Sequence, residues 1–142
     1  MQKCIFAILS LSFILLVGCQ QPKKKLTTTR YDPASSQFAF LKKPLENVKI
    51  IALGESSHGF GSLHTLKSNL VQYLHQELGY DVLVFEAGYG DVGASWNKVD
   101  ESTPNQLINS TVSGNLRSEQ LRALFEYLKE KKNSENPLEL RG

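Results

Sequence analysis

The chain has 142 residues, with 16 Lys and Arg against 14 Asp and Glu, so its formal net charge is +2. Four of the basic residues, Lys3 and the run 23–25, precede residue 26, and the remainder carries 12 basic and 14 acidic residues, a net charge of −2. Without a basic surface, nucleic acid is excluded as an expected partner. The length allows a single domain.

Residues 1–18 are predicted to be a lipoprotein-type signal peptide. A basic start is followed by an apolar run over residues 5–17, which has the length of a signal-peptide core and is short for a membrane span. The run ends in Leu16-Val17-Gly18-Cys19, which resembles the lipobox of bacterial lipoproteins. This resemblance implies lipidation of Cys19 and a membrane anchor in the cell envelope, on the periplasmic side of the outer membrane in a Gram-negative cell. An ordinary secretory signal with an incidental cysteine is the alternative.

The cysteine count excludes several kinds of protein. Cys4 would leave with the signal peptide and Cys19 would be acylated, so the mature chain would have no disulfide, thiol nucleophile or zinc ribbon. Residues 19–44 are polar and are predicted to be a tether and lead-in segment, in which Phe38, Phe40 and Leu41 pack as a short helix or strand. Residues 45–142 are the predicted domain.

A strand, a helix and a second strand are expected at the start of this domain. Residues 48–54 form a short apolar run that ends in glycine, which is typical of a buried parallel strand. Leucines at 63, 66, 70, 74 and 78 recur at helical spacing, and Gly79 ends the pattern. Residues 82–85 are apolar again and predict the second strand. Together they predict one right-handed βαβ unit.

The rest of the chain is expected to be mostly helical. Residues 90–101 are rich in Gly and Asp and predict a loop, while residues 104–112 predict a short helix. Residues 118–131 predict a longer helix with Ser118 as its N-cap. Residues 137–140 resemble the approach to a third strand. The fold class expected is therefore α/β, an incomplete parallel βαβ sheet layer with flanking helices, in a chain that looks truncated.

Three residues with acid–base side chains are expected at one edge of this sheet. Glu55 follows the first predicted strand, Glu86 ends the second, and His58 lies in the turn before the helix. The carboxyl ends of parallel strands share an edge, where ligands bind in open α/β sheets. A histidine with two carboxylates suits proton transfer, and it equally suits a divalent metal.

Three short segments of this region match a family pattern: Gly54-Glu55-Ser56-Ser57-His58-Gly59, Glu77-Leu78-Gly79-Tyr80 and Val84-Phe85-Glu86-Ala87. Their sequence and spacing resemble the erythromycin esterase family. The match covers residues 48–88 well and continues loosely through the 118–131 helix. Members of this family run to several hundred residues, so the resemblance implies an N-terminal fragment.

The resemblance implies a hydrolase acting on a small-molecule ester or lactone, macrolides included, and a chain that is inactive if the rest of the site is missing. The cofactor stays open, a divalent metal included. By position, His58 would be the base that activates water, and Glu55 and Glu86 would orient it or hold the water. Lys67 and His64, on the following helix, would contact substrate; surface exposure is the alternative for His64. His75 is expected to face solvent. A different function remains open: a non-catalytic lipoprotein that binds a divalent metal or small ligand through His58, Glu55 and Glu86.

Overall fold

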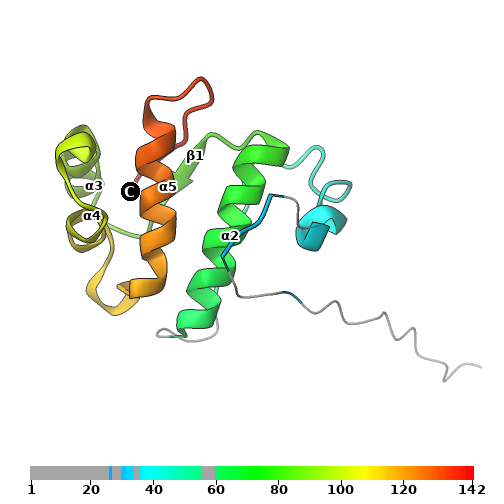
Figure 1. The fold of residues 1–142 in the computed structure, drawn as a ribbon, viewed down its shortest axis with the longest axis horizontal. Coiled ribbons are helices and arrows are strands. Elements are labelled where there is room, and N and C mark those ends of the chain that lie inside the picture. Colours follow the sequence, from blue (N-terminus) through cyan, green and yellow to red (C-terminus); the bar gives the residue numbers. More distant parts are fainter. Residues whose placement is uncertain (1–25, 27–29, 34–35, 56–59) are drawn as a thin grey trace, which may run out of the picture.

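The computed structural model describes residue 26 and residues 30–33, 36–55 and 60–142. These residues form a mixed α/β fold with mostly helices and a small parallel sheet (Figure 1). In chain order the elements are the 3₁₀ helix η2 (Ser36–Leu41), helix α2 (Gly61–Leu78), strand β1 (Val82–Val84), helix α3 (Tyr89–Asn97), η3 (Val99–Glu101), α4 (Pro104–Thr111), η4 (Gly114–Leu116), η5 (Glu119–Leu121), α5 (Arg122–Lys132) and strand β2 (Glu139–Arg141).

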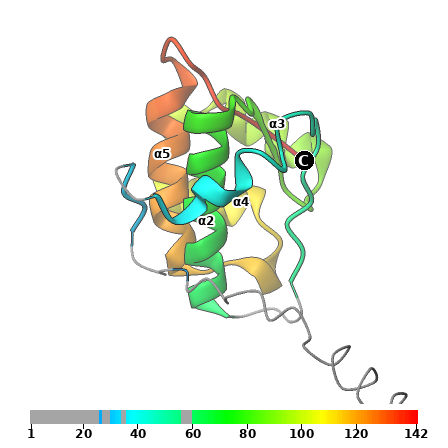
Figure 2. The same ribbon diagram turned by 90° about the vertical axis from the view of Figure 1, so that its right-hand side faces the viewer.

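Helix α2 is the central element and confirms the helix expected from the leucine spacing. Gly79 follows it in the left-handed conformation, with φ of 73°, and its N–H bonds the His75 carbonyl. Both sides of the helix are packed. The leucine side contacts the lead-in segment, and an opposite stripe contacts η5 and α5, which lie beside α2 in both views (Figures 1 and 2). The buried members of this second stripe are His64, Ser68, Val71 and His75.

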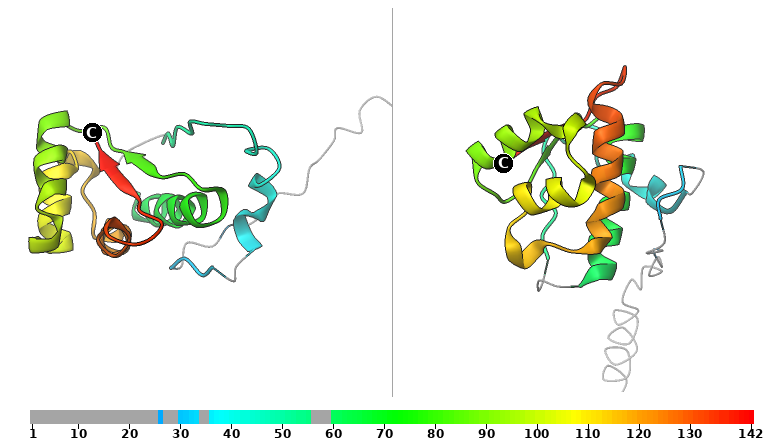
Figure 3. Two further views of the ribbon diagram at one scale, coloured as in Figure 1. Left: turned by 90° about the horizontal axis from the view of Figure 1, so that it is seen from above. Right: turned by 60° about the vertical axis from the view of Figure 1, so that its left-hand side comes forward.

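Strands β1 and β2 pair in parallel, with Leu83 opposite Leu140 (Figure 3). Their side chains alternate as a half-buried sheet requires: Leu140 is fully buried and Leu83 packs on the core, whereas Val82 and Val84 are exposed. Two of the expected strands are thus confirmed, the second one and the one that the run 137–140 approached.

The strand expected over residues 48–54 is not formed. In the described part of the chain these residues lie along β1 without belonging to the sheet (Figure 3). Their side chains still alternate: Ile51 and Leu53 pack inward, while Ile50 is 86% exposed. A parallel strand gains most when both of its faces are covered. Because Ile50, Val82 and Val84 are all exposed, pairing here would bury little more apolar surface.

The loop expected over residues 90–101 is also wrong, because most of it is helix α3. Its glycines lower the helix propensity, but Val92 and Trp96, four residues apart, both point into the core. Burial of this pair outweighs the propensity cost. Helix α4 is confirmed, with a capping box between Thr103 and Gln106. The helix expected over residues 118–131 is confirmed as η5 followed by α5.

Two apolar clusters hold these elements together. The larger cluster joins α3, α4, α5, β2 and one side of α2, and Phe125 and Leu128 are at its centre. The smaller cluster joins the other side of α2 to the lead-in segment, where Phe38 is 1% exposed and packs against Tyr73 with the two rings tilted. Of the lead-in aromatics, Phe38 is therefore packed in a short 3₁₀ helix, whereas Phe40 is exposed. None of the helices among the described residues is long and apolar enough to cross a membrane.

Candidate functional site

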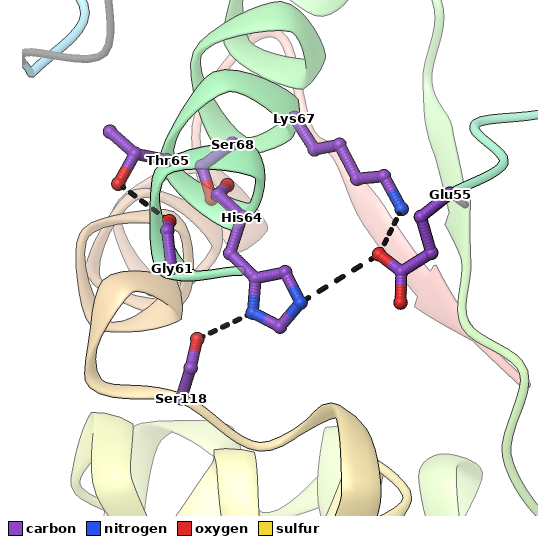
Figure 4. A network of polar contacts seen from close by, with 7 residues as sticks. All are labelled: Glu55, Gly61, His64, Thr65, Lys67, Ser68 and Ser118. Carbon is purple, nitrogen blue, oxygen red and sulfur yellow. Dashed lines mark hydrogen bonds and ion pairs between the residues drawn. The ribbon is translucent and has the colours of Figure 1, made fainter. Parts of the chain in front are cut away.

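Glu55 and Lys67 form an ion pair between the extended segment and helix α2. Lys67 Nζ donates to Glu55 Oε2 at 2.7 Å (Figure 4). The Glu55 side chain is only 8% exposed and that of Lys67 is 23% exposed. Because both side chains are largely shielded from water, the attraction between the two charges is screened less than at the protein surface. The pair therefore fixes the Glu55 carboxylate in one orientation.

His64 lies one helical turn before Lys67 and approaches the same carboxylate. Its Nε2 is 3.8 Å from Glu55 Oε2, and its Nδ1 is 2.6 Å from Ser118 Oγ (Figure 4). Residues three and four apart share one face of a helix, which is why α2 directs His64 and Lys67 to the same side. Ser68, on the next step of this face, bonds back to the His64 carbonyl at 2.8 Å. The imidazole is 4% exposed.

A cavity of about 650 Å³ opens beside this polar group. Glu55, His64, Lys67 and Glu86 line it, together with the extended segment and β1. Its remaining wall is apolar and comes mainly from Val71, Leu74, Leu83, Leu121, Leu124 and Leu138. A mostly apolar hollow with a few convergent polar groups is the usual form of a small-molecule site.

The residues predicted from the sequence divide into three groups. Glu55, His64 and Lys67 are in direct contact or within ion-pair distance. Glu86 lines the same cavity but is exposed, and its backbone carbonyl accepts a hydrogen bond from Ser113 Oγ at 2.9 Å. His58 and Cys19 lie outside the described residues. The alternative that His64 is exposed at the surface is wrong, because His64 belongs to the buried stripe of α2 that packs against η5.

Ser118 is the part of this site that sequence reasoning missed. It was expected to cap a helix, yet its side chain makes no capping hydrogen bond and contacts His64 instead. The two residues are 54 positions apart, and no local pattern links them. Only the packing of η5 against α2 brings them together.

The alternative function, metal binding, finds no suitable set of ligands among the described residues. Within residues 26, 30–33, 36–55 and 60–142, no group of three or more His, Cys, Asp or Glu side chains could hold a metal ion. Glu55 is instead engaged by Lys67. His58, the central ligand of that hypothesis, lies outside these ranges.

His75 lies away from this site, and the expectation that it faces solvent is wrong. It is buried between α2 and α5, where its Nδ1 and the Tyr127 hydroxyl are 2.5 Å apart. Burial lowers the pKa of His75 below its ordinary value of 6.5, and the polar backbone near Pro137 offsets this effect only in part. Burial likewise raises the pKa of Tyr127. This pair is a packing feature of the helix interface.

The chain is 39% identical, over 109 residues, to the Bacillus subtilis (strain 168) protein named "Putative hydrolase YbfO". The similarity is to a protein named as a hydrolase. It covers 77% of this chain but only 24% of YbfO, so the chain spans about a quarter of the length of this relative. No family model matches the sequence, and no solved structure matches it.

Proposed function

We propose that this chain carries part of the active site of a hydrolase that cleaves carboxylic esters or lactones with water. The observation that carries the proposal is the Glu55 carboxylate, held by Lys67 at the polar end of an apolar cavity. A fixed acid–base group beside a hollow of this kind is what hydrolysis of an apolar ester needs. The similarity to a protein named as a hydrolase supports the reaction class, and the erythromycin esterase resemblance supports the ester bond.

In the proposed mechanism His58 is the base. It removes a proton from water as the water oxygen attacks the ester carbonyl carbon, which gives a tetrahedral intermediate. The bond to the alcohol oxygen then breaks, and the proton passes from His58 to that oxygen. Glu55 orients the imidazole or the water and stabilises the positive charge that develops on the base. Glu86, on the same cavity, is proposed to hold the water.

For Lys67 we propose a role other than the substrate contact expected from the sequence. Its ammonium group is already bonded to Glu55, so we assign it to fixing the carboxylate rather than to binding the oxyanion directly. Stabilising the oxyanion of the intermediate requires further hydrogen-bond donors near the carbonyl oxygen. We propose that the activity of this chain depends on such donors and that its rate is low where they are lacking.

A substrate panel with the 142-residue chain tests the reaction class. The purified chain is assayed with p-nitrophenyl butyrate, a medium-ring lactone, p-nitrophenyl phosphate and an aryl amide. We expect turnover of the ester and the lactone only, and a loss of about 100-fold or more in kcat/KM for His58→Ala. Turnover confined to the phosphate or the amide, or a His58→Ala variant with unchanged ester hydrolysis, would overturn the proposal.

A further inference from the structure

We propose that Ser118 and His64 form a positioning pair that holds the Glu55 carboxylate in its working orientation. The inference rests on the proposed function, since it concerns the carboxylate of that site. It adds Ser118, which precedes η5, to a site otherwise built from the extended segment and α2, and it gives His64 of α2 a positioning role. Neither residue needs to touch substrate for this role.

The first argument is that Ser118, His64 and Glu55 form a continuous series of polar contacts. Ser118 Oγ is 2.6 Å from His64 Nδ1, and His64 Nε2 is 3.8 Å from Glu55 Oε2 (Figure 4). The imidazole therefore stands between a hydroxyl and a carboxylate, with one ring nitrogen facing each. The same carboxylate oxygen accepts from Lys67, so His64 and Lys67 approach it together.

The second argument concerns the proton on the imidazole. A neutral imidazole has one N–H donor and one bare nitrogen. A bare Nε2 facing a carboxylate would set two electron-rich atoms against each other, so Glu55 favours the form with the proton on Nε2. His64 Nδ1 is then an acceptor, and the Ser118 hydroxyl donates to it. Ser118 thus supports the tautomer that Glu55 favours, the one whose Nε2–H is attracted to the carboxylate.

The third argument is burial. His64 is 4% exposed, and a buried polar ring that loses its partner costs free energy, because water cannot replace the lost hydrogen bond. Ser118 begins the η5 turn, and Leu121 at the end of that turn lines the cavity. The Ser118–His64 bond thus ties one cavity wall to the helix that carries Lys67. The arrangement matches the way outer partners orient a histidine or carboxylate in other catalytic sites.

Histidine ¹⁵N NMR of the 142-residue chain measures the tautomer of His64 directly, independent of any activity. For neutral His64 we expect a protonated Nε2 and an acceptor Nδ1, and we expect Ser118→Ala to shift the Nδ1 resonance. Ser118→Thr, which keeps the hydroxyl, should restore it. The control is Ser110→Ala, because the Ser110 hydroxyl bonds only the Leu107 carbonyl within its own helix. A protonated Nδ1 with bare Nε2 in the wild type would overturn the proposal.

Ester kinetics with the same variants give the second readout. Ser118→Ala and His64→Gln should lower kcat about tenfold while KM changes less than about twofold, since the carboxylate is misplaced while the apolar wall of the cavity is kept. Ser118→Thr should recover most of kcat. Full activity in Ser118→Ala would overturn the positioning role. If the wild type hydrolyses no ester, the proposed function fails, and the tautomer measurement still decides whether Ser118 sets the proton on His64.

Discussion

Two basic side chains, those of His64 and Lys67, approach the largely buried Glu55 carboxylate from one face of helix α2. Lys67 bonds it directly, and His64 stands 3.8 Å from the same oxygen. A carboxylate with 8% exposure has lost most of its hydration, so its partners must supply what water no longer does. The proposed function and the stability of the fold therefore both depend on this residue.

Removal of Lys67 should leave that carboxylate without its hydrogen-bonded cation. We expect Lys67→Met to lower the free energy of unfolding by about 1–3 kcal/mol, less than for a fully buried pair because Lys67 is 23% exposed. Urea unfolding measures this, with the exposed Lys98→Met as the matched control. Adding Glu55→Gln to Lys67→Met should recover part of the loss. A strictly additive double variant would contradict the pairing.

His75 should make stability depend on pH. Because burial holds the pKa of His75 below 6.5 in the folded chain, the unfolded chain binds a proton first as the pH falls. The contribution of His75 is thus fully present above pH 6.5 and is lost as the pH drops from there to the folded pKa, at no more than about 1.4 kcal/mol per pH unit. Unfolding by urea between pH 7.5 and 5 should show His75→Gln converging on the wild type. Parallel curves would refute this.

At the scale of elements, the end of α2 depends on one glycine. Gly79 has φ of 73°, where a side chain is strained, and a Cβ there would meet nothing within 4 Å. We expect Gly79→Ala to destabilise the chain by about 1 kcal/mol through backbone strain alone. Gly93→Ala is the matched control: Gly93 lies inside α3, also with open space, so the change should stabilise by about 0.5–1 kcal/mol. Thermal melts that move both variants in the same direction would count against this reading.

Elements with a strong local signal could be predicted from the sequence. The leucine spacing of α2, the apolar run of β1 and the amphipathic pattern of α5 each predict an element that the structure contains. The failures are at places where tertiary packing decides. Helix α3 forms despite its glycines because Val92 and Trp96 reach the core. The run 48–54 has the composition of a buried strand, but pairing needs a covered outer face, and Val84 is exposed.

The candidate site was predictable only where its residues are close in sequence to a strand or helix end. Glu55 and Glu86 follow from the strand-end argument and line one cavity. The ion pair with Lys67 follows from neither composition nor periodicity, since it depends on the path of the extended segment past α2. Ser118 is even harder to predict from the sequence, because its place beside His64 depends on how η5 packs against α2.

At the scale of the whole molecule, the sequence predicts a membrane anchor on Cys19. We expect the 142-residue chain, expressed in a bacterium, to incorporate labelled fatty acid and to sediment with membranes. A single acyl group binds only marginally, but a diacylated cysteine with a further acyl chain binds stably. Cys19→Ala should remove the label and block processing of the signal peptide, and Cys4→Ala should do neither. Label retained in Cys19→Ala would show that the cysteine is incidental.

The cavity and its polar end connect the two apolar clusters of the fold. Its wall takes Leu74 from the smaller cluster and Val71, Leu121 and Leu124 from the larger one. The site is therefore formed only when the extended segment, α2 and α5 are all in place. The account rests centrally on Glu55, whose side chain is 8% exposed and bonded to Lys67.

The measurement that tests this most directly is ester hydrolysis by the wild type, Glu55→Gln and Glu130→Gln. Both variants exchange a carboxylate for an amide, but the Glu130 side chain is on the surface. We predict that Glu55→Gln, folded by circular dichroism, loses about 100-fold or more in kcat/KM while Glu130→Gln keeps the wild-type value. Wild-type turnover that survives in Glu55→Gln would contradict the account, because the carboxylate at its centre would then have no part in the reaction.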